Sequence, residues 1–341
     1  MATIKDVASL AGVSVSTVSY ALSGVRPVSA EKMASIQTAM QELRYQPNRI
    51  ARSLASKRTR IIAILFPKVE HGIGFSEIDL ILEAAKSALR YGYQLVIWTL
   101  TANSAEELQE LLTQELVDGV ILMEVHLGDP RIGVLKKRRV PFILLGRDAD
   151  KPEETFIDID FFTTMMECFT YLKGLGHRNV AFINQSEKSF RAGYGPVVRT
   201  HEAFSYFLEN FEIKGREFFC ESDSAQVCAI TEKLLAEDPG VTAFISMNDA
   251  SLPGLIRGIE QRGRRIPQDV SIVSIVSSAR PASNYLPAIT AFEMDIHTLM
   301  DLAVTQLIAK LDGRYAELPE RLIACVLRER QSAGAAGGSG F

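Results

Sequence analysis

The side chains that most often perform catalysis are scattered along this sequence of 341 residues. The chain has no H-E-x-x-H zinc pair, G-x-S-x-G nucleophile turn, P-loop or G-x-G-x-x-G fingerprint. Five histidines and four cysteines, without a C-x-x-C pair, lie far apart: His71, His126, His177, His201, His297, Cys168, Cys220, Cys228 and Cys325. We therefore predict no catalytic residues, no metal site and no cofactor. An enzyme is kept as the alternative from a different class.

The apolar pattern fits neither a membrane protein nor a secreted one. The longest apolar run, 61–67, has the length of a strand rather than the ~18–20 residues of a membrane helix. Residues 1–6 carry no apolar signal-peptide core, which argues against a periplasmic binding protein. Widely separated cysteines are typical of a reducing compartment. We expect a cytoplasmic chain with no membrane partner and with two or three domains, at about 100–200 residues per domain.

Basic residues are concentrated at the start of the chain. Residues 1–60 hold nine lysines and arginines against three acids, a net charge of +6, whereas the remaining residues carry −10. A basic head on an acidic body favours a module that binds a polyanion, joined to a part with another task. A solvated charged surface is the simpler alternative.

Three short helices are predicted in the head. Thr3 opens a capping-box pattern, and apolar residues follow it at helical spacing. Gly12 then breaks the pattern, and Ser14 can cap a second helix at 15–22. A third helix is predicted at 30–43. Two short helices joined by a glycine-containing turn describe a helix-turn-helix, whose second helix enters the DNA major groove. A helical cap without a ligand is the alternative on geometry alone.

The residues of this head resemble the opening of LacI/GalR-type bacterial transcription regulators. The matching segments occur in the family's order: TIKDVA at 3–8, AGVS at 11–14, STVS at 16–19, VS at 28–29, YQPN at 45–48 and ARSL at 51–54. Later segments extend the resemblance to about residue 330: LGHR at 175–178, ND at 248–249, IPQDVSI at 266–272 and PAIT at 287–290. The resemblance implies a DNA-binding regulator with a helix-turn-helix domain at 1–46.

The same resemblance implies a role for individual residues of the head. Val15, Ser16 and Tyr20 match positions that read base edges, and the hydroxyls nearby match positions that contact phosphates. Tyr20 departs from the usual arginine, so the operator should differ at the base pair that faces it. The full set of implied DNA contacts is Thr3, Ser14, Val15, Ser16, Thr17, Ser19, Tyr20, Ser29, Asn48, Ala51, Arg52, Leu54 and Ala55.

Residues 47–59 are expected to form the linker. Pro47 limits the third helix, and 49–56 is compatible with a short helix that is marginal on its own in water. The simpler alternative is a flexible basic tether. The resemblance implies a hinge helix that pairs with its copy in the DNA minor groove, where Leu54 wedges between base pairs.

From residue 60 to 330 apolar strands alternate with amphipathic helices, which predicts parallel sheets with both faces covered. The pattern restarts after residue 160, so we expect two successive α/β lobes of the periplasmic-binding-protein type. Ligands of such sheets bind beyond the carboxyl ends of the strands. The last residues, 331–341, are rich in glycine and alanine, and we expect them to be disordered.

Where the family binds its effector, this chain departs from the family pattern. Gly146 stands at a usual aspartate, Thr200 at the usual arginine, and SIVS at 274–277 replaces a GFDD turn. We expect effector contacts from Phe75, Ser76, Glu77, Trp98, Arg147, Arg191, Arg199, Asn248, Asp249 and Ser277. A sugar is the effector class that the resemblance implies. The arginines leave open a sugar acid, sugar phosphate or sulfonate; a nucleobase and an effectorless or partner-sensing regulator are further alternatives.

We therefore predict a homodimeric repressor of a carbohydrate uptake or catabolism operon, associated with the nucleoid when bound to its operator. A small effector between the lobes would release it from DNA. The sequence leaves open whether the effector acts as inducer or co-repressor, because that depends on which conformation the ligand prefers.

Overall fold

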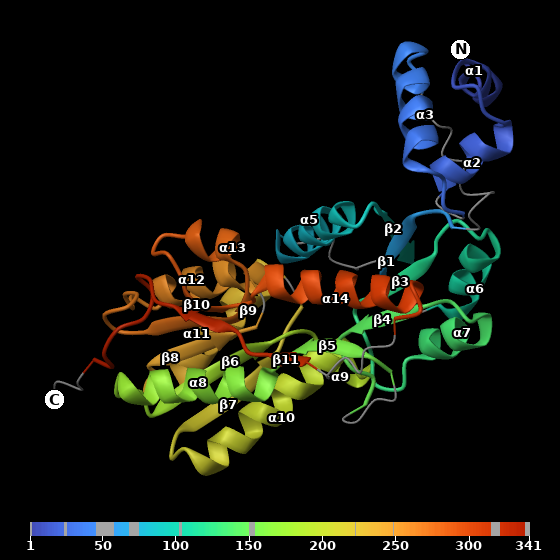
Figure 1. Ribbon diagram of the computed structural model, residues 1–341. Helices are drawn as coiled ribbons and strands as arrows, with labels where there is room; N and C mark the ends of the chain where they lie inside the picture. Colours follow the sequence, from blue (N-terminus) through green and yellow to red (C-terminus); the bar gives the residue numbers. More distant parts are fainter. Residues whose placement is uncertain are drawn as a thin grey trace.

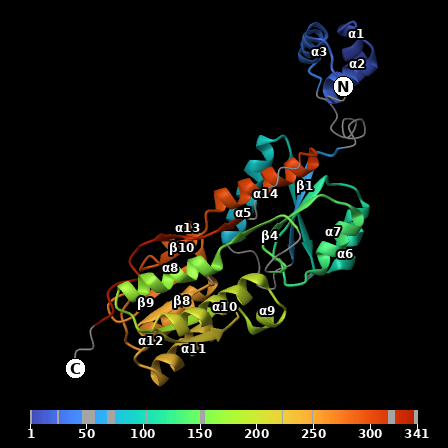
Figure 2. The ribbon, with the colours of Figure 1, turned by 60° about the horizontal axis from the view of Figure 1, so that its bottom comes forward.

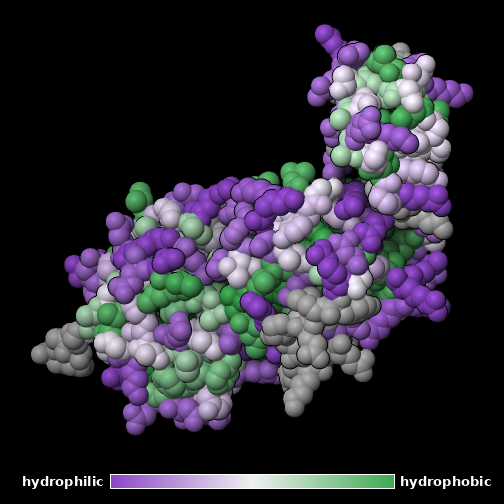
Figure 3. Space-filling model, in the orientation of Figure 1, coloured by the Kyte–Doolittle hydropathy of each residue, from purple (hydrophilic) through white to green (hydrophobic). Residues whose placement is uncertain are grey.

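The computed structural model describes residues 2–23, 26–45, 58–67, 75–101, 104–149, 154–221, 223–247, 249–314 and 321–337. It shows a small helical head and a larger body of two α/β lobes, and in two views the head projects from one end of the body (Figures 1 and 2). In the described part of the chain no helix is long and apolar enough to cross a membrane. Hydrophilic residues interrupt the hydrophobic ones over the face shown in Figure 3.

The head contains the three helices that the sequence predicts: α1 (Ile4–Leu10), α2 (Val15–Ser23) and α3 (Ala30–Glu42). Thr3 and Asp6 form a complete capping box at the start of α1. Gly12 has a φ of +64°, the left-handed conformation that the turn between α1 and α2 requires. The three helices enclose a small core of Val7, Ala8, Val18, Ile36 and Ala39.

The first lobe, which we call the N lobe, is a six-stranded sheet with the order β11-β5-β4-β3-β1-β2. All of its described pairings are parallel. Helices α5 and α14 cover one face of the sheet, and α6 and α7 cover the other. The elements are β1 (Ile61–Pro67), α5 (Phe75–Arg90), β2 (Gln94–Leu100), α6 (Ala105–Thr113), β3 (Gly119–Leu122), α7 (Pro130–Arg138), β4 (Phe142–Leu145), β5 (Phe156–Ile159), α14 (Ile296–Leu311) and β11 (Arg321–Ile323).

The second lobe, the C lobe, is a sheet with the order β12-β10-β9-β8-β6-β7, parallel except that β12 runs antiparallel to β10. Helices α8 and α10 cover one face, and α11 and α12 cover the other. The elements are α8 (Phe161–Gly174), β6 (Asn179–Asn184), α9 (Glu187–Arg191), α10 (Gly195–Asn210), β7 (Lys214–Phe219), α11 (Ser224–Glu237), β8 (Ala243–Ser246), η1 (Asp249–Ser251), α12 (Leu252–Gln261), β9 (Ser271–Ser277), α13 (Ala279–Ser283), β10 (Thr290–Glu293) and β12 (Val326–Arg328).

The two lobes are not successive along the chain, which corrects the sequence prediction. The chain passes from β5 to α8, returns from β10 to α14, and passes again from β11 to β12. Helix α14 therefore belongs to the N lobe, where Met300, Val304 and Leu307 pack with Ile62 and Ile121. Hydrophobic periodicity shows that a helix is amphipathic but not which sheet its apolar face covers.

The expected disorder of residues 331–341 is wrong for 331–337. Ser332 is fully buried; its hydroxyl accepts a hydrogen bond from Thr290 N (2.8 Å) and donates to Ile272 O (2.6 Å). Nε2 of the buried His177 ring lies 3.1 Å from the carbonyl oxygen of Gly334. The small residues of this segment permit close packing against β9, so their composition reflects a tight contact rather than a flexible tail.

We predict that Ser332→Ala lowers the free energy of unfolding by about 1–3 kcal/mol, because it removes the hydroxyl partner of two buried backbone groups. Thermal or denaturant unfolding of the full chain measures the change. Ser283→Ala, at an exposed serine of the same lobe, is the control and should unfold like the unchanged protein. Equal stability of Ser332→Ala and the unchanged protein would contradict this account.

Candidate functional sites

Helix α2 presents a row of hydroxyls on the outside of the head. Ser14 caps the helix, since its Oγ accepts a hydrogen bond from Thr17 N at 3.1 Å. The same Oγ lies 2.8 Å from both Ser16 Oγ and Thr17 Oγ1. Val18 points into the core and is fully buried, whereas Val15 is 42% exposed. The helix is thus fixed through its inner face while Val15 and the hydroxyls remain accessible to a partner.

The other predicted contacts of the head have varied surroundings. Arg26 lies over the ring of Tyr20, with its guanidinium carbon 5.1 Å from the ring centre, so the two side chains form a cation–π pair. Thr3 donates to Asp6 through its backbone N–H (2.7 Å) and its hydroxyl (2.8 Å), and the backbone bond is the main cause that lowers the pKa of Asp6. Ser19 is half-buried, and Ser29 is exposed at the start of α3.

The linker contacts Asn48, Ala51, Arg52, Leu54 and Ala55 lie outside the described residues, so their assignment stays a prediction.

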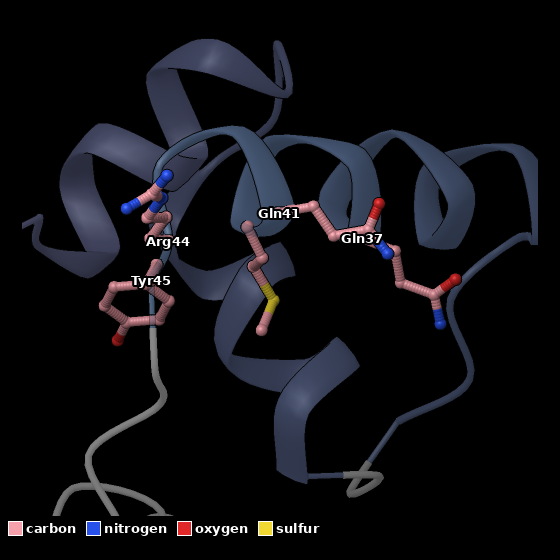
Figure 4. A pocket seen from close by; sticks show the side chains of 5 residues that line it. Gln37, Gln41, Arg44 and Tyr45 are labelled. Atoms are coloured by element: carbon pink, nitrogen blue, oxygen red, sulfur yellow. The ribbon is translucent and has the colours of Figure 1, made fainter.

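A hollow of about 590 Å³ lies on the head along α3 (Figure 4). It is lined by residues of α3 and the turn that follows it: Gln37, Met40, Gln41, Arg44 and Tyr45. Because its walls come from one helix and its end, it is an open surface feature, and we assign no ligand to it.

Asp249 is the centre of a polar cluster where the two lobes meet. Ser76, in the first turn of α5, donates to Asp249 Oδ2 from the N lobe at 3.3 Å. Ser274 and Ser277, on β9, donate to Oδ1 at 3.2 and 2.8 Å. Burial raises the pKa of Asp249 to about 6, against the effect of the three hydroxyl donors, and the charge of Glu77 raises it further. The carboxylate is thus held by neutral donors.

The N lobe adds a second carboxyl group to that of Asp249, namely Glu124, which follows β3. Burial raises the pKa of Glu124 to about 7, although the Tyr194 hydroxyl donates a hydrogen bond to it; Glu77 again adds a raising effect. A backbone contact brings the two residues together, since Gly195 N donates to Val125 O at 3.1 Å. A Cβ at Gly195 would meet Arg199 Nη1 at 2.3 Å and Val125 O at 3.0 Å, so this approach requires glycine.

The three predicted arginines are engaged by groups of the protein itself. Arg147 Nε donates to Asp158 at 2.9 Å, and Arg199 Nη2 donates to the carbonyl oxygen of Arg147 at 3.0 Å. Burial raises the pKa of Asp158, and Arg199 and Arg147 oppose that effect by their charge. Arg191 lies on α9 with its side chain 75% exposed and pairs with Glu187 at 2.6 Å. Arg191 therefore belongs to a surface ion pair.

The remaining effector predictions have mixed outcomes. Ser76, Asp249 and Ser277 lie together, and Glu77 is close enough to shift the pKa of its neighbours. Trp98 is half-buried and packs on the hydrophobic cluster beneath α6 and α7, and its place in the site stays a prediction. Phe75 is the first residue of α5, and Asn248 lies outside the described residues.

Sequence reasoning missed Glu124, Tyr194, Ser274 and Asp158. Glu124 follows an apolar strand as Asp249 does, and that position was the available signal. Asp158 lies inside β5, a strand of only four residues.

We call the group formed by Ser76, Glu77, Glu124, Tyr194, Asp249, Ser274 and Ser277 the interlobe site. Its carboxylates can accept hydrogen bonds and its hydroxyls can donate or accept them, which suits a ligand with several hydroxyl groups. Within the described ranges no cluster of three or more histidine, cysteine or acidic residues could hold a metal ion.

Comparison with known proteins matches both parts of the chain. The family described as "Bacterial regulatory proteins, lacI family" matches residues 3–48, and a "Periplasmic binding protein-like domain" matches residues 169–333. The HTH-type transcriptional repressor PurR of Erwinia tasmaniensis is 30% identical over 342 residues, covering 97% of each chain.

Solved structures give the same result for the fold. A lac repressor dimer bound to operator and the anti-inducer ONPF has a TM-score of 0.81 at 24% identity, covering 98% of this chain and 99% of that one. A complex of the transcriptional regulator CelR with cellobiose has a TM-score of 0.68 at 25% identity, covering 97% and 100%.

We predict that Glu124→Gln stabilises the protein more at pH 8 than at pH 5. With its pKa raised from 4.5 to about 7, Glu124 keeps its proton in the folded state while the unfolded chain ionises, so stability falls as the pH rises through this range. Glutamine keeps an acceptor for Tyr194 and never ionises. Melting temperatures at the two pH values measure the effect, with Glu202→Gln, an exposed position on α10, as control. A difference that does not change with pH would refute the assignment.

Proposed function

The chain belongs to the LacI family of bacterial regulatory proteins and is a DNA-binding transcriptional repressor, and from this premise we propose that it controls carbohydrate uptake or catabolism. A carbohydrate bound at the interlobe site would release it from its operator. The observation that carries the proposal is the Asp249 cluster, in which hydroxyl donors from both lobes converge on one carboxylate. The relative in complex with cellobiose supports the same ligand class.

In the cytoplasm, the heads of a homodimer would bind a pseudo-palindromic operator. Val15, Ser16 and Tyr20 would face base edges, while Thr17 and Ser19 would contact phosphates. Thr3, Ser14 and Ser29 would be further DNA contacts of the head. The exposure of Val15 and the cap formed by Ser14 agree with these roles. The linker residues would form the minor-groove contact, with Leu54 as the wedge.

The charges of the interlobe site favour a neutral ligand over an anionic one. The charge of Glu77 raises the pKa of both Glu124 and Asp249, and the side chains that donate to Asp249 are uncharged hydroxyls. Arg147 is paired with Asp158. An anionic effector would approach three carboxyl groups, so a sugar acid, phosphate or sulfonate is a poorer fit than a neutral sugar.

A carbohydrate at this position would act by favouring one arrangement of the lobes. Ser76 belongs to the N lobe and Asp249 to the C lobe, so a ligand that competes for their hydrogen bond changes the contact between the lobes. Release from the operator follows if the ligand binds better to the arrangement that holds DNA poorly.

We expect Leu54→Ala to weaken operator binding by about tenfold or more, because loss of a buried leucine side chain costs about 1.5–3 kcal/mol. Operator duplexes are selected from random DNA with the full chain, and affinity is measured by fluorescence anisotropy. Leu54→Met is the control that keeps an apolar wedge. Unchanged affinity of Leu54→Ala would remove the wedge from the proposal.

Effector binding is tested by a thermal-shift screen of the full chain against neutral mono- and disaccharides, sugar acids, sugar phosphates and sulfonates. A ligand at 100 times its dissociation constant should stabilise the protein by about 2.7 kcal/mol. We expect shifts with neutral sugars that Asp249→Asn abolishes and that Asp269→Asn, a change at a surface ion pair, leaves intact. Shifts with anions alone, or shifts that survive Asp249→Asn, would contradict the proposal.

A further inference from the structure

Two carboxylates from distant parts of the sequence, Asp118 and Asp312, bind the residues at which the chain passes from the linker into the body. Asp118, just before β3, accepts hydrogen bonds from Thr59 N (2.7 Å), Thr59 Oγ1 (2.8 Å) and Arg60 N (2.9 Å). These three bonds use both oxygens of one side chain, so they fix the direction of the backbone at residues 59 and 60.

Asp312, at the carboxyl end of α14, binds Arg58, the residue that precedes Thr59. Arg58 Nη1 donates to Asp312 Oδ1 at 2.7 Å, and Arg58 Nη2 donates to the carbonyl oxygen of Leu311 at 2.5 Å. The hydrogen bond from Arg58 is the main cause that lowers the pKa of Asp312. A cation at the carboxyl end of a long helix also interacts favourably with the helix dipole. Side chains of the pair are only about a third exposed, at 34% and 31%.

Helix α14 is itself fixed firmly to the N lobe. Lys310 Nζ donates to Phe142 O at 3.0 Å, next to the end of the helix, and Ser87 of α5 donates to Asp301 at 2.8 Å. Figure 1 shows α14 and α5 side by side along the sheet, and their apolar faces share one core. A residue held by the end of α14 therefore moves with the whole lobe.

We propose that Asp118 and Asp312 are positioning residues for operator binding: they fix the direction in which the linker leaves the body. Neither residue need touch DNA. Ordering a residue costs about 1–2 kcal/mol of backbone entropy, so residues ordered before binding reduce what DNA docking must supply. The inference concerns the DNA-binding activity of the family and is independent of the effector.

The alternative is that Arg58 contacts a phosphate and that Asp312 competes for it. The two accounts predict opposite signs for Asp312→Asn. If Asp312 positions the linker, its loss weakens specific binding. If it competes, its loss frees Arg58 and strengthens binding, with a steeper salt dependence, by about 0.9 in the log–log slope for one added phosphate contact.

The experiment uses full-length protein, an operator selected with the unchanged chain, and a random duplex of the same length. We expect Asp312→Asn and Asp118→Asn to weaken operator binding about tenfold, with no change in salt slope or in affinity for the random duplex. Asp312→Glu keeps the carboxylate and should recover most of the affinity. Asp269→Asn, which removes a carboxylate from a surface ion pair of the C lobe, is the matched control.

Melting temperature separates positioning from general instability. Asp312→Asn should melt within a few degrees of the unchanged protein, since an ion pair at the surface contributes only about 0–1 kcal/mol. Operator affinity that is unchanged or higher, or an equal loss on the random duplex, would overturn the proposal. Failure to select any operator would instead count against the assigned DNA-binding activity.

Discussion

A carboxylate that is partly withdrawn from water needs hydrogen bonds, and the half-buried Asp249 obtains them from two lobes at once. Its own lobe provides Ser274 and Ser277, and the other lobe provides Ser76. The hydrogen bonding of Asp249 therefore depends on how the lobes are arranged. The hydrogen bond from Ser76 to Asp249 in turn stabilises that arrangement. A small molecule rich in hydroxyls can take the place of the serine that the N lobe contributes, which makes the contact between the lobes sensitive to a ligand.

The same N lobe also holds the linker. Helix α5 begins at the interlobe site and packs along α14, and the carboxyl end of α14 binds Arg58. Between the two sites the structure has packed helices and ion pairs such as that of Arg90 with Asp301. If the N lobe moves as one rigid body, a displacement at Ser76 also displaces the start of the linker, and no separate pathway of coupled residues is needed.

Local sequence rules predicted the parts of the structure that local interactions determine. The capping box at Thr3, the left-handed Gly12 and the cap at Ser14 are set by neighbours in sequence, and all three are present. Asp249 and Ser277 were predicted because they lie where the resemblance to the family implies effector contacts. Glu124 follows an apolar strand, and polar residues at the carboxyl ends of parallel strands meet at one edge of a sheet, but it was overlooked.

The failures concern contacts that form over long separations in sequence. Arg147 and Arg199 suggested an anion site, because the sequence does not reveal that Asp158 lies beside them. The membership of α14 in the N lobe depends on where the chain returns after more than a hundred residues, and the hydrogen bond of Ser332 to β9 joins residues 60 apart in sequence.

The chain crosses between the lobes three times, and these crossings also determine the order in which the parts of the protein can fold during synthesis. The head has all the side chains that pack in its core by Tyr45, so it can fold as soon as it leaves the ribosome. The N lobe cannot close until α14 and β11 emerge, after nearly all of the C lobe has been made. A nascent or prematurely ended chain would thus carry a finished DNA-binding head on a body that lacks a central part of its core.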